Sequence, residues 1–290
     1  MGDEPRFLAA YDAVLRQWPV PVRGVDVPTP YGSTRVHVCG PEDGSPVVLL
    51  PGGGTTSVVW YANAGALAAT HRVYAVDLIG DFGRSVHDGA PLRDAGDLVT
   101  WLEAVLDGLG LDRVHLCGHS YGAWIALRHA LHAPHRLAGL ALLDPAQCFT
   151  RMSSRYLLHA VLTLLRPAAQ RPRAFHRWET GRDPEDRVWR EFLDSTAGLK
   201  RSKVVAMPRP AEHALRACPV RTLVVAAERS RAHDASRMAA DARRLLPGAE
   251  VVVLPGASHH SIPTERPGEL NRLLADFFGS GDPRHISGTS

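Results

Sequence analysis

Cysteine is scarce in this 290-residue sequence, and the placement of its four cysteines speaks against two kinds of site. Cys39, Cys117, Cys148 and Cys218 lie far apart and form no Cys-x-x-Cys pair, which is the spacing of structural zinc sites and redox motifs. We therefore expect neither a metal nor a cofactor. Buried free thiols in a reducing cytoplasm are the simpler interpretation.

Long hydrophobic runs and an excess of one charge are also missing. No apolar run approaches the roughly 20 residues of a membrane-spanning helix, and residues 1–5 lack the basic and then apolar pattern of a secretory signal. The net charge is only +3, Lys200 and Lys203 are the only lysines, and the arginines are spread along the chain. We expect a cytoplasmic protein with no nucleic-acid and no membrane partner; the oligomeric state stays open.

The pattern of hydrophobic residues predicts a large α/β domain. At 45% hydrophobic residues, the chain is long enough to bury a sizeable core. Short runs that are apolar throughout alternate with helical patterns, as a parallel sheet covered on both faces requires. The predicted strands are 47–50, 73–76, 114–117, 137–143, 221–226 and 250–254, and the predicted helices are 60–69, 95–109, 123–133, 235–246 and 267–278. The fold class is thus α/β, with a doubly wound, mostly parallel sheet.

Before these strands, two further patterns are expected at the margin of the fold. The runs 24–27 and 34–39, separated by turn residues, predict an antiparallel hairpin at the edge of the sheet. Residues 7–18 have an apolar stripe at helical spacing, which predicts a helix packed on the outside of the sheet.

The alternation of strands and helices breaks once, between residues 146 and 217. Several helical patterns follow one another there without a convincing strand, which predicts a helical lid inserted into the domain. The core then consists of residues 1–145 and 218–279. Residues 280–290 are rich in glycine and serine and are interpreted as a flexible tail.

Residues 118–122, Gly-His-Ser-Tyr-Gly, connect a predicted strand to a predicted helix. This is the G-x-S-x-G spacing of a nucleophile elbow, a sharp turn whose glycines leave room for a strained serine backbone. The Ser120 hydroxyl would then point out of the fold, at the positive end of the following helix dipole. Such a pentapeptide is common, so its context has to decide.

The order of these features resembles the α/β-hydrolase superfamily over residues 24–278. The elbow follows the fifth of about eight strands, an insertion follows the next strand, and the serine precedes a histidine-containing loop. The resemblance implies a mostly parallel eight-stranded sheet, a helical lid and the chemistry of a serine esterase.

Residues 49–54, Leu-Leu-Pro-Gly-Gly-Gly, resemble the oxyanion loop of this family. By position, the resemblance implies that the backbone N–H groups of Gly53 and Tyr121 form the oxyanion hole. Pro51 stands where the family usually has histidine, which leaves a backbone donor intact. The glycines lack the Gly-Lys-Ser/Thr ending of a phosphate-binding loop. Residues 77–85 resemble the family's D-x-x-G-x-G-x-S stretch with one residue inserted, and are interpreted as structural.

Residues 255–265, after the last strand, resemble the loop that carries the family's catalytic base. That base has to be a neutral imidazole within hydrogen-bond reach of the nucleophile. Two adjacent histidines compete for the role. His259 follows the small residue Ser258, which suits a crowded turn, whereas counting back from Glu265 selects His260. We favour His259, with His260 as the alternative.

The acid of the triad departs from the commonest pattern of the family. Ser230 occupies the position after the seventh strand where the family usually has a carboxylate. Asp144, at the end of the sixth strand, is the best candidate, because some members, including a branch of the haloalkane dehalogenases, place the acid there. Asp234 and Glu228 are alternative acids, and Asp144 could instead only cap its strand.

Together these residues predict a serine hydrolase that cleaves a small carboxylic ester through Ser120, His259 and Asp144. A serine nucleophile disfavours dehalogenase and epoxide-hydrolase chemistry. The unusual acid keeps a second hypothesis open, a catalytically silent protein of this fold that binds a ligand or a partner. The lid's aromatic residues suit an apolar pocket, although such a stripe is more often core; they are Phe149, Tyr156, Phe175, Trp178 and Trp189.

Overall fold

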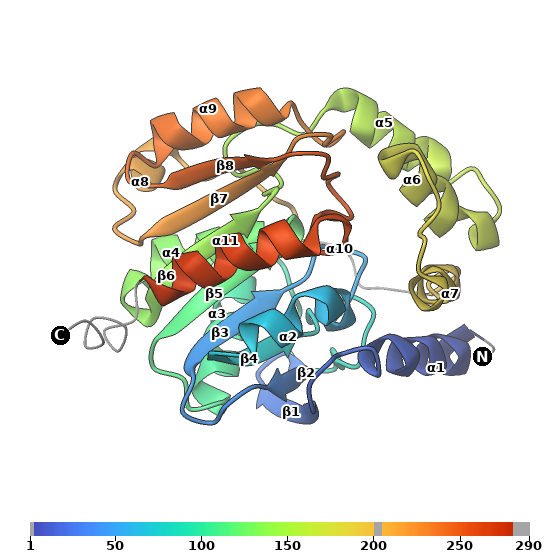
Figure 1. The fold of residues 1–290 in the computed structure, drawn as a ribbon, viewed down its shortest axis with the longest axis horizontal. Helices are drawn as coiled ribbons and strands as arrows, with labels where there is room; N and C mark the ends of the chain where they lie inside the picture. Colours follow the sequence, from blue (N-terminus) through green and yellow to red (C-terminus); the bar gives the residue numbers. More distant parts are fainter. Residues whose placement is uncertain (1–2, 200–204, 281–290) are drawn as a thin grey trace.

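The computed structural model describes residues 3–199 and 205–280, which fold around an eight-stranded sheet (Figure 1). The strand order is β1-β2-β4-β3-β5-β6-β7-β8. Strand β2 runs antiparallel to both of its neighbours, and the pairings from β4 to β8 are all parallel. The strands are β1 (Arg23–Thr29), β2 (Gly32–Cys39), β3 (Ser45–Leu50), β4 (His71–Val76), β5 (Val114–His119), β6 (Leu137–Leu143), β7 (Thr222–Ala227) and β8 (Glu250–Leu254). This confirms the predicted fold class and the hairpin at the sheet edge.

Both faces of the sheet are covered, because its central strands are apolar on both sides. Val48 and Leu50 of β3 face one core, and Val47 and Leu49 face the other; all four are fully buried. The first core holds α3 (Ala95–Gly108), α4 (Tyr121–His132) and α9 (Ala235–Leu245). The second holds η1 (Ser57–Ala62), α2 (Ala64–Leu67) and α11 (Pro267–Gly279). The stretch 60–69, expected as one helix, is divided between η1 and α2.

Between β6 and β7 the described residues form helices and no strand (Figure 1). They are α5 (Ser154–Thr163), η3 (Ala168–Gln170), α6 (Arg171–Thr180), α7 (Arg187–Ser195) and α8 (Glu212–Arg216). This is the segment predicted as a lid, 146–217, of which 200–204 lie outside the described residues; its division from the core remains a proposal. The tail predicted at 280–290 lies outside the described residues from 281 onward. Two short helices complete the chain, η2 (Pro134–Arg136) and α10 (Ile262–Glu265).

Helix α1 (Asp3–Leu15) has partners beyond the sheet on which it was expected to pack. Its Tyr11 hydroxyl lies 2.6 Å from His37 Nε2 of β2, and the helix also packs against η1 and α7 (Figure 1). Its apolar stripe explains the placement, because Phe7 and Tyr11 are buried in the same core as Phe192 of α7, and the rings of Phe7 and Phe192 are 5.7 Å apart. The stripe is buried as predicted, and the lid segment is one of its partners.

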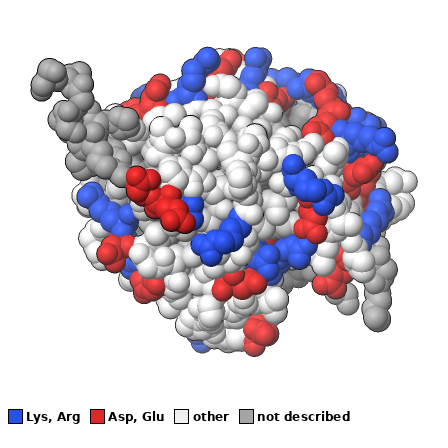
Figure 2. All heavy atoms as spheres, turned by 60° about the horizontal axis from the view of Figure 1, so that its bottom comes forward, with Lys and Arg blue, Asp and Glu red and all other residues white. Residues whose placement is uncertain are grey.

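Figure 2 shows basic and acidic side chains interspersed over the face that it draws. That face therefore carries no field of one sign. All four cysteines are free; Cys39, Cys117 and Cys148 are buried and Cys218 is half-buried. None of the described helices is both long and apolar enough to cross a membrane.

The turn between β5 and α4 is possible only because glycine stands on both sides of Ser120. A Cβ added at Gly118 would lie 2.3 Å from the carbonyl oxygen of Gly122, and one added at Gly122 would lie 2.4 Å from that of Pro51. Both obstacles are backbone atoms, which cannot swing away as a side chain can. The glycines thus let the elbow press against the loop that follows β3.

We expect Gly122→Ala to lower the free energy of unfolding by about 1–3 kcal/mol, the usual cost of overpacking a dense interior. The new methyl group would meet backbone oxygens of the β3 loop. Urea unfolding followed by circular dichroism measures the change. Gly248→Ala is the matched control, since its Cβ would meet no atom within 4 Å. Equal stabilities of the two variants would contradict this account of the turn.

Candidate active site

Three of the predicted residues meet in one hydrogen-bonded chain at the carboxyl ends of β5, β6 and β8. Ser120 Oγ lies 2.8 Å from His259 Nε2, and His259 Nδ1 lies 2.6 Å from Asp144 Oδ2. Because an ionised carboxylate can only accept, the geometry assigns the ring proton to Nδ1 and leaves Nε2 to accept from the serine hydroxyl. This is the arrangement of a nucleophile, a base and an orienting acid.

The backbone at two of these residues is strained. Ser120 has φ 51° and ψ −110°, and Asp144 has φ 41°, a left-handed region that residues with a side chain rarely adopt. Each is held by the sheet, since the N–H of Ser120 donates to Leu143 O and the N–H of Asp144 donates to Val225 O. Strain that is maintained by its surroundings is typical of functional sites.

Asp144 is fully buried and accepts four hydrogen bonds. Ala227 N–H and His233 Nε2 donate to Oδ1, while the hydroxyl of Ser230 and His259 Nδ1 donate to Oδ2. Burial alone would raise the pKa of Asp144, but the two histidines outweigh it and hold that pKa below its ordinary value. Ser230, at the position where the family usually has its acid, is therefore a hydrogen-bond donor to Asp144.

The two alternative acids have other partners. Glu228 accepts the N–H of Gly256 at 2.8 Å, and Asp234 caps α9 by accepting the N–H of Arg237 at 2.7 Å. Neither bonds to His259. Among the described residues, no group of histidine, cysteine and carboxylate side chains is placed to hold a metal ion.

His119 is a site residue that the sequence reasoning missed. Its ring is fully buried, and its Nε2 donates to the carbonyl oxygen of His259 at 2.7 Å. Burial, reinforced by the charge of His259, lowers the pKa of His119 to about 3, so the ring is neutral at ordinary pH. His119 thereby ties the histidine loop to the elbow. Its position directly before Ser120 in the G-x-S-x-G pentapeptide was the only sequence feature that could have pointed to His119.

Glu179 of α6 is a second missed residue. Its buried Oε2 accepts the N–H of His260 at 2.9 Å and lies 3.9 Å from His260 Nδ1. Its Oε1 has no hydrogen-bond partner among the described residues. Burial raises the pKa of Glu179 to about 7. His260 also lies 3.4 Å from the hydroxyl of Tyr156, so the alternative base faces the lid segment and not Ser120.

The glycine loop after β3 lies against the elbow. A Cβ added at Gly53 would be 3.4 Å from Tyr121 Cβ, and Tyr121 begins α4. The loop is held from below, since Asp81 accepts the N–H of Gly54 at 2.7 Å and Asp77 accepts the N–H of Ser57 at 2.8 Å. The stretch 77–85 therefore supports this loop, in keeping with its structural interpretation.

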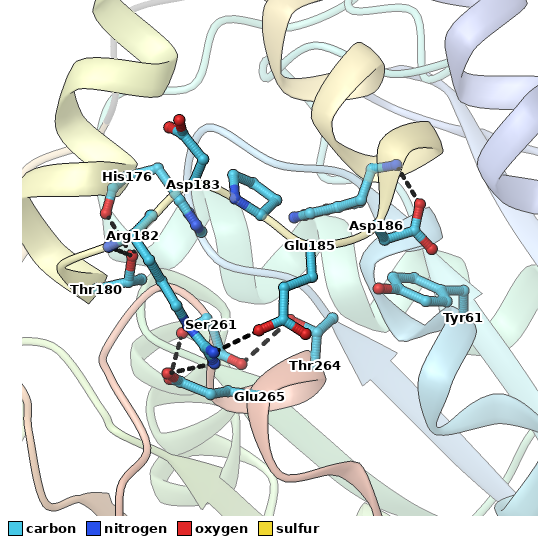
Figure 3. Close-up of a pocket in the computed structure, with 12 residues that line it drawn as sticks. Tyr61, His176, Thr180, Arg182, Asp183, Glu185, Asp186, Ser261, Thr264 and Glu265 are labelled. Atoms are coloured by element: carbon cyan, nitrogen blue, oxygen red, sulfur yellow. Dashed lines mark hydrogen bonds and ion pairs between the residues drawn. The ribbon is translucent and has the colours of Figure 1, made fainter.

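A cavity of about 230 Å³, drawn in Figure 3, lies between α6, the loop between α6 and α7, and the residues that follow the histidine pair. Tyr61 and Trp189 form part of its wall, and Arg182 and Glu265 form an ion pair of 3.5 Å at another side. Ser120, His259 and Asp144 do not line this cavity. The aromatic residues nearest the histidines are instead Tyr156, whose ring centroid is 5.8 Å from that of His259, and Phe175, 5.0 Å from that of His260.

A family model described as the alpha/beta hydrolase family matches residues 47–273, most of the chain. The chain belongs to the alpha/beta hydrolase family. It is 29% identical to the carboxylesterase YbfK of Bacillus subtilis over 288 residues, 95% of this chain and 94% of that relative. The crystal structure of the Bacillus subtilis carboxylesterase CesB (YbfK) has a TM-score of 0.90, with 26% identity over 97% of this chain and 100% of that one. The naproxen esterase of Bacillus subtilis has a TM-score of 0.89, with 26% identity and coverages of 96% and 99%. The resemblance inferred from the sequence is thus confirmed.

We expect the buried carboxyl of Glu179 to make stability depend on pH. With a folded pKa of about 7 against 4.5 for an ordinary glutamate, its contribution is fully present below 4.5 and is lost as pH rises to 7, a loss on the order of 3 kcal/mol. Glu179→Gln, which cannot ionise, should therefore lose less stability than wild type between pH 4.5 and pH 8. Urea unfolding at the two pH values measures the difference.

Glu185→Gln is the control for this prediction. Glu185 lies in the loop between α6 and α7, its side chain is 81% exposed, and the change removes the same charge. It should leave the pH dependence of wild type in place. A Glu179→Gln protein that followed wild type at both pH values would show that the carboxyl ionises as freely as an exposed one.

Proposed function

We propose that this protein hydrolyses small carboxylic esters through an acyl-enzyme formed on Ser120. At the coarser level it is an ester hydrolase of the alpha/beta hydrolase family, as its full-length similarity to a carboxylesterase supports. The single observation that carries the finer proposal is the hydrogen-bonded chain from Ser120 Oγ through His259 to Asp144.

In the acylation step, Ser120 Oγ attacks the ester carbonyl carbon while its proton passes to His259 Nε2. The carboxylate of Asp144 accepts from Nδ1 and stabilises the imidazolium that forms. The carbonyl oxygen becomes an oxyanion, for which we assign the N–H groups of Gly53 and Tyr121 as donors. The Tyr121 N–H lies at the N-terminus of α4, where the helix dipole also favours negative charge.

The tetrahedral intermediate then collapses, and His259 gives its proton to the departing alcohol oxygen. In the second half, His259 takes a proton from water while the water oxygen attacks the acyl carbon on Ser120. The second tetrahedral intermediate collapses, His259 returns the proton to Ser120 Oγ, and the carboxylic acid is released. The His259 ring has to occupy the same position in acylation and in deacylation. The hydrogen bond from His119 Nε2 to the carbonyl oxygen of His259, and the four donors that hold Asp144, keep the ring in that position.

The surroundings of the histidines favour an apolar group on the substrate. Tyr156 and Phe175 lie against His259 and His260, and most of a small-molecule site is usually apolar with a few placed polar groups. The silent-protein alternative was motivated by the lack of an acid after β7. Asp144, 2.6 Å from His259, supplies a carboxylate from β6 instead, which favours the enzyme.

Ser120→Ala should reduce the hydrolysis of a short p-nitrophenyl ester by at least about 10³-fold, because no other group replaces the nucleophile. A fluorophosphonate should label wild type at Ser120. Ser154→Ala, an exposed serine at the start of α5, is the control and should keep the wild-type rate. If wild type hydrolyses no short ester and Ser120 is not labelled, the proposed function fails.

The pH profile tests the pairing of Asp144 with His259. Burial lowers the pKa of His259, but the hydrogen bond to Asp144 and its charge outweigh burial and raise that pKa above 6.5. The base works only when neutral, so kcat/KM should fall as pH decreases through the raised pKa. In Asp144→Asn this limb should move to lower pH, and kcat should fall by about 10⁴-fold.

Asp234→Asn is the matched control, because Asp234 caps α9 and should leave both the rate and the profile unchanged. Loss of turnover in Asp234→Asn with full turnover in Asp144→Asn would contradict the assignment of the acid.

A further inference from the structure

Exposed apolar side chains are concentrated on one lid helix. Of the seven large hydrophobic side chains that are strongly exposed among the described residues, six lie on α5 or in the turn directly after it, with exposed fractions of 47% to 81%. Their spacing puts most of them on one side of the helix. Scattered exposed leucines are ordinary, but a contiguous group of this size marks a surface that meets something. The six are Leu157, Leu158, Val161, Leu162, Leu164 and Leu165.

The opposite side of α5 is the part that packs on the protein. Tyr156 and Thr163 are buried, and Tyr156 reaches the histidine pair. In Figure 1, α5 stands at the outer end of the lid segment beside α6, with no further element beyond it. Helix α5 thus lies between its own outer face and the candidate active site.

The Lys, Arg, Asp and Glu residues of the segment that contains α5 are all arginine. Between residues 145 and 178 the sequence contains six arginines and no aspartate or glutamate. Two of the six pair with acids further along the chain, Arg173 with Asp194 and Arg177 with Asp183. Arg151, Arg155 and Arg166 are exposed, and none of them forms an ion pair with another described residue. The remaining one, Arg171, donates to the carbonyl oxygens of Leu164 and Arg166 and so closes the turn after α5.

We propose that the outer face of α5 docks on an anionic phospholipid bilayer. The six apolar side chains would enter the boundary between headgroups and acyl chains, and Arg151, Arg155 and Arg166 would bind lipid phosphates. An apolar stripe bordered by arginine is the pattern of a helix that lies in the plane of a membrane surface. This proposal departs from the expectation of no membrane partner, which rested on the lack of a spanning run; that lack bears on crossing a bilayer and not on binding to its surface.

The charges decide against a second copy of the chain as the occupant. A symmetric dimer through α5 would bring two arginine-bordered faces together, and segment 145–178 has no acid to pair with them. A bilayer of anionic lipid satisfies both the apolar stripe and the arginines. This inference is independent of the ester chemistry proposed for Ser120.

Co-sedimentation of the full chain with vesicles tests the proposal. Wild type should bind vesicles of phosphatidylglycerol mixed with phosphatidylcholine, bind pure phosphatidylcholine at least tenfold more weakly, and lose affinity as salt is raised. Val161→Asp, at a side chain that is 60% exposed, should weaken binding at least tenfold by placing a charge in the apolar stripe. Arg155→Ala should weaken it about fivefold, the effect of one cation near the surface.

Val86→Asp is the matched control. Among the described residues outside this segment, Val86 is the one strongly exposed large hydrophobic side chain, at 53%. The Val86→Asp protein should bind vesicles like wild type. Thermal unfolding verifies that each variant is folded.

Three results would overturn the proposal. They are the failure of folded wild type to bind anionic vesicles, equal binding by Val161→Asp and wild type, and equal binding to neutral and anionic vesicles. Sedimentation velocity without lipid gives a fourth, since a dimer that Val161→Asp abolishes would make a second copy the occupant of this face.

Discussion

The buried carboxylate of Asp144 is the group on which the arrangement of the candidate site depends. A carboxylate removed from water is tolerated only when its oxygens are satisfied, and here the donors come from the last residue of β7 and from the segments that follow β7 and β8. These connections fix the loops to one another and leave the His259 ring a single orientation. The position of the base is therefore a consequence of satisfying a buried charge.

The core of the fold was readable because burial on both faces of a parallel sheet leaves a direct trace in the sequence. The run at β3 is apolar at every position from Val47 to Leu50, which only a strand covered on both sides explains. Helix α1 shows where this reasoning ends. Its apolar stripe indicated that one side is buried, but a stripe does not say against what, and α7 is a partner that the stripe did not reveal. Contacts between segments far apart in the chain are set by shape, which single-sequence patterns do not carry.

The site residues also divide into those that a local sequence pattern reveals and those that depend on contacts between distant segments. Ser120 could be picked out because an elbow is a local motif of five residues. The choice among Asp144, Asp234 and Glu228 needed distances across the fold, which no spacing supplies. His119 and Glu179 were missed for this reason: their partners His259 and His260 lie 140 and 81 positions away along the chain.

Asp144 lies directly before the inserted helices, and this determines where the core of the fold ends. Directly after Asp144, the N–H of Ala146 contacts the carbonyl oxygen of Ser120 at 3.4 Å, Gln147 takes a left-handed conformation, and Cys148 Sγ bonds back to Ala146 O. These first residues of the insertion are thus built into the elbow itself. For exchange of the inserted helices between relatives, the usable junction lies beyond Cys148; a graft made at the end of β6 would also change the residues that hold Ser120 and Asp144 in place.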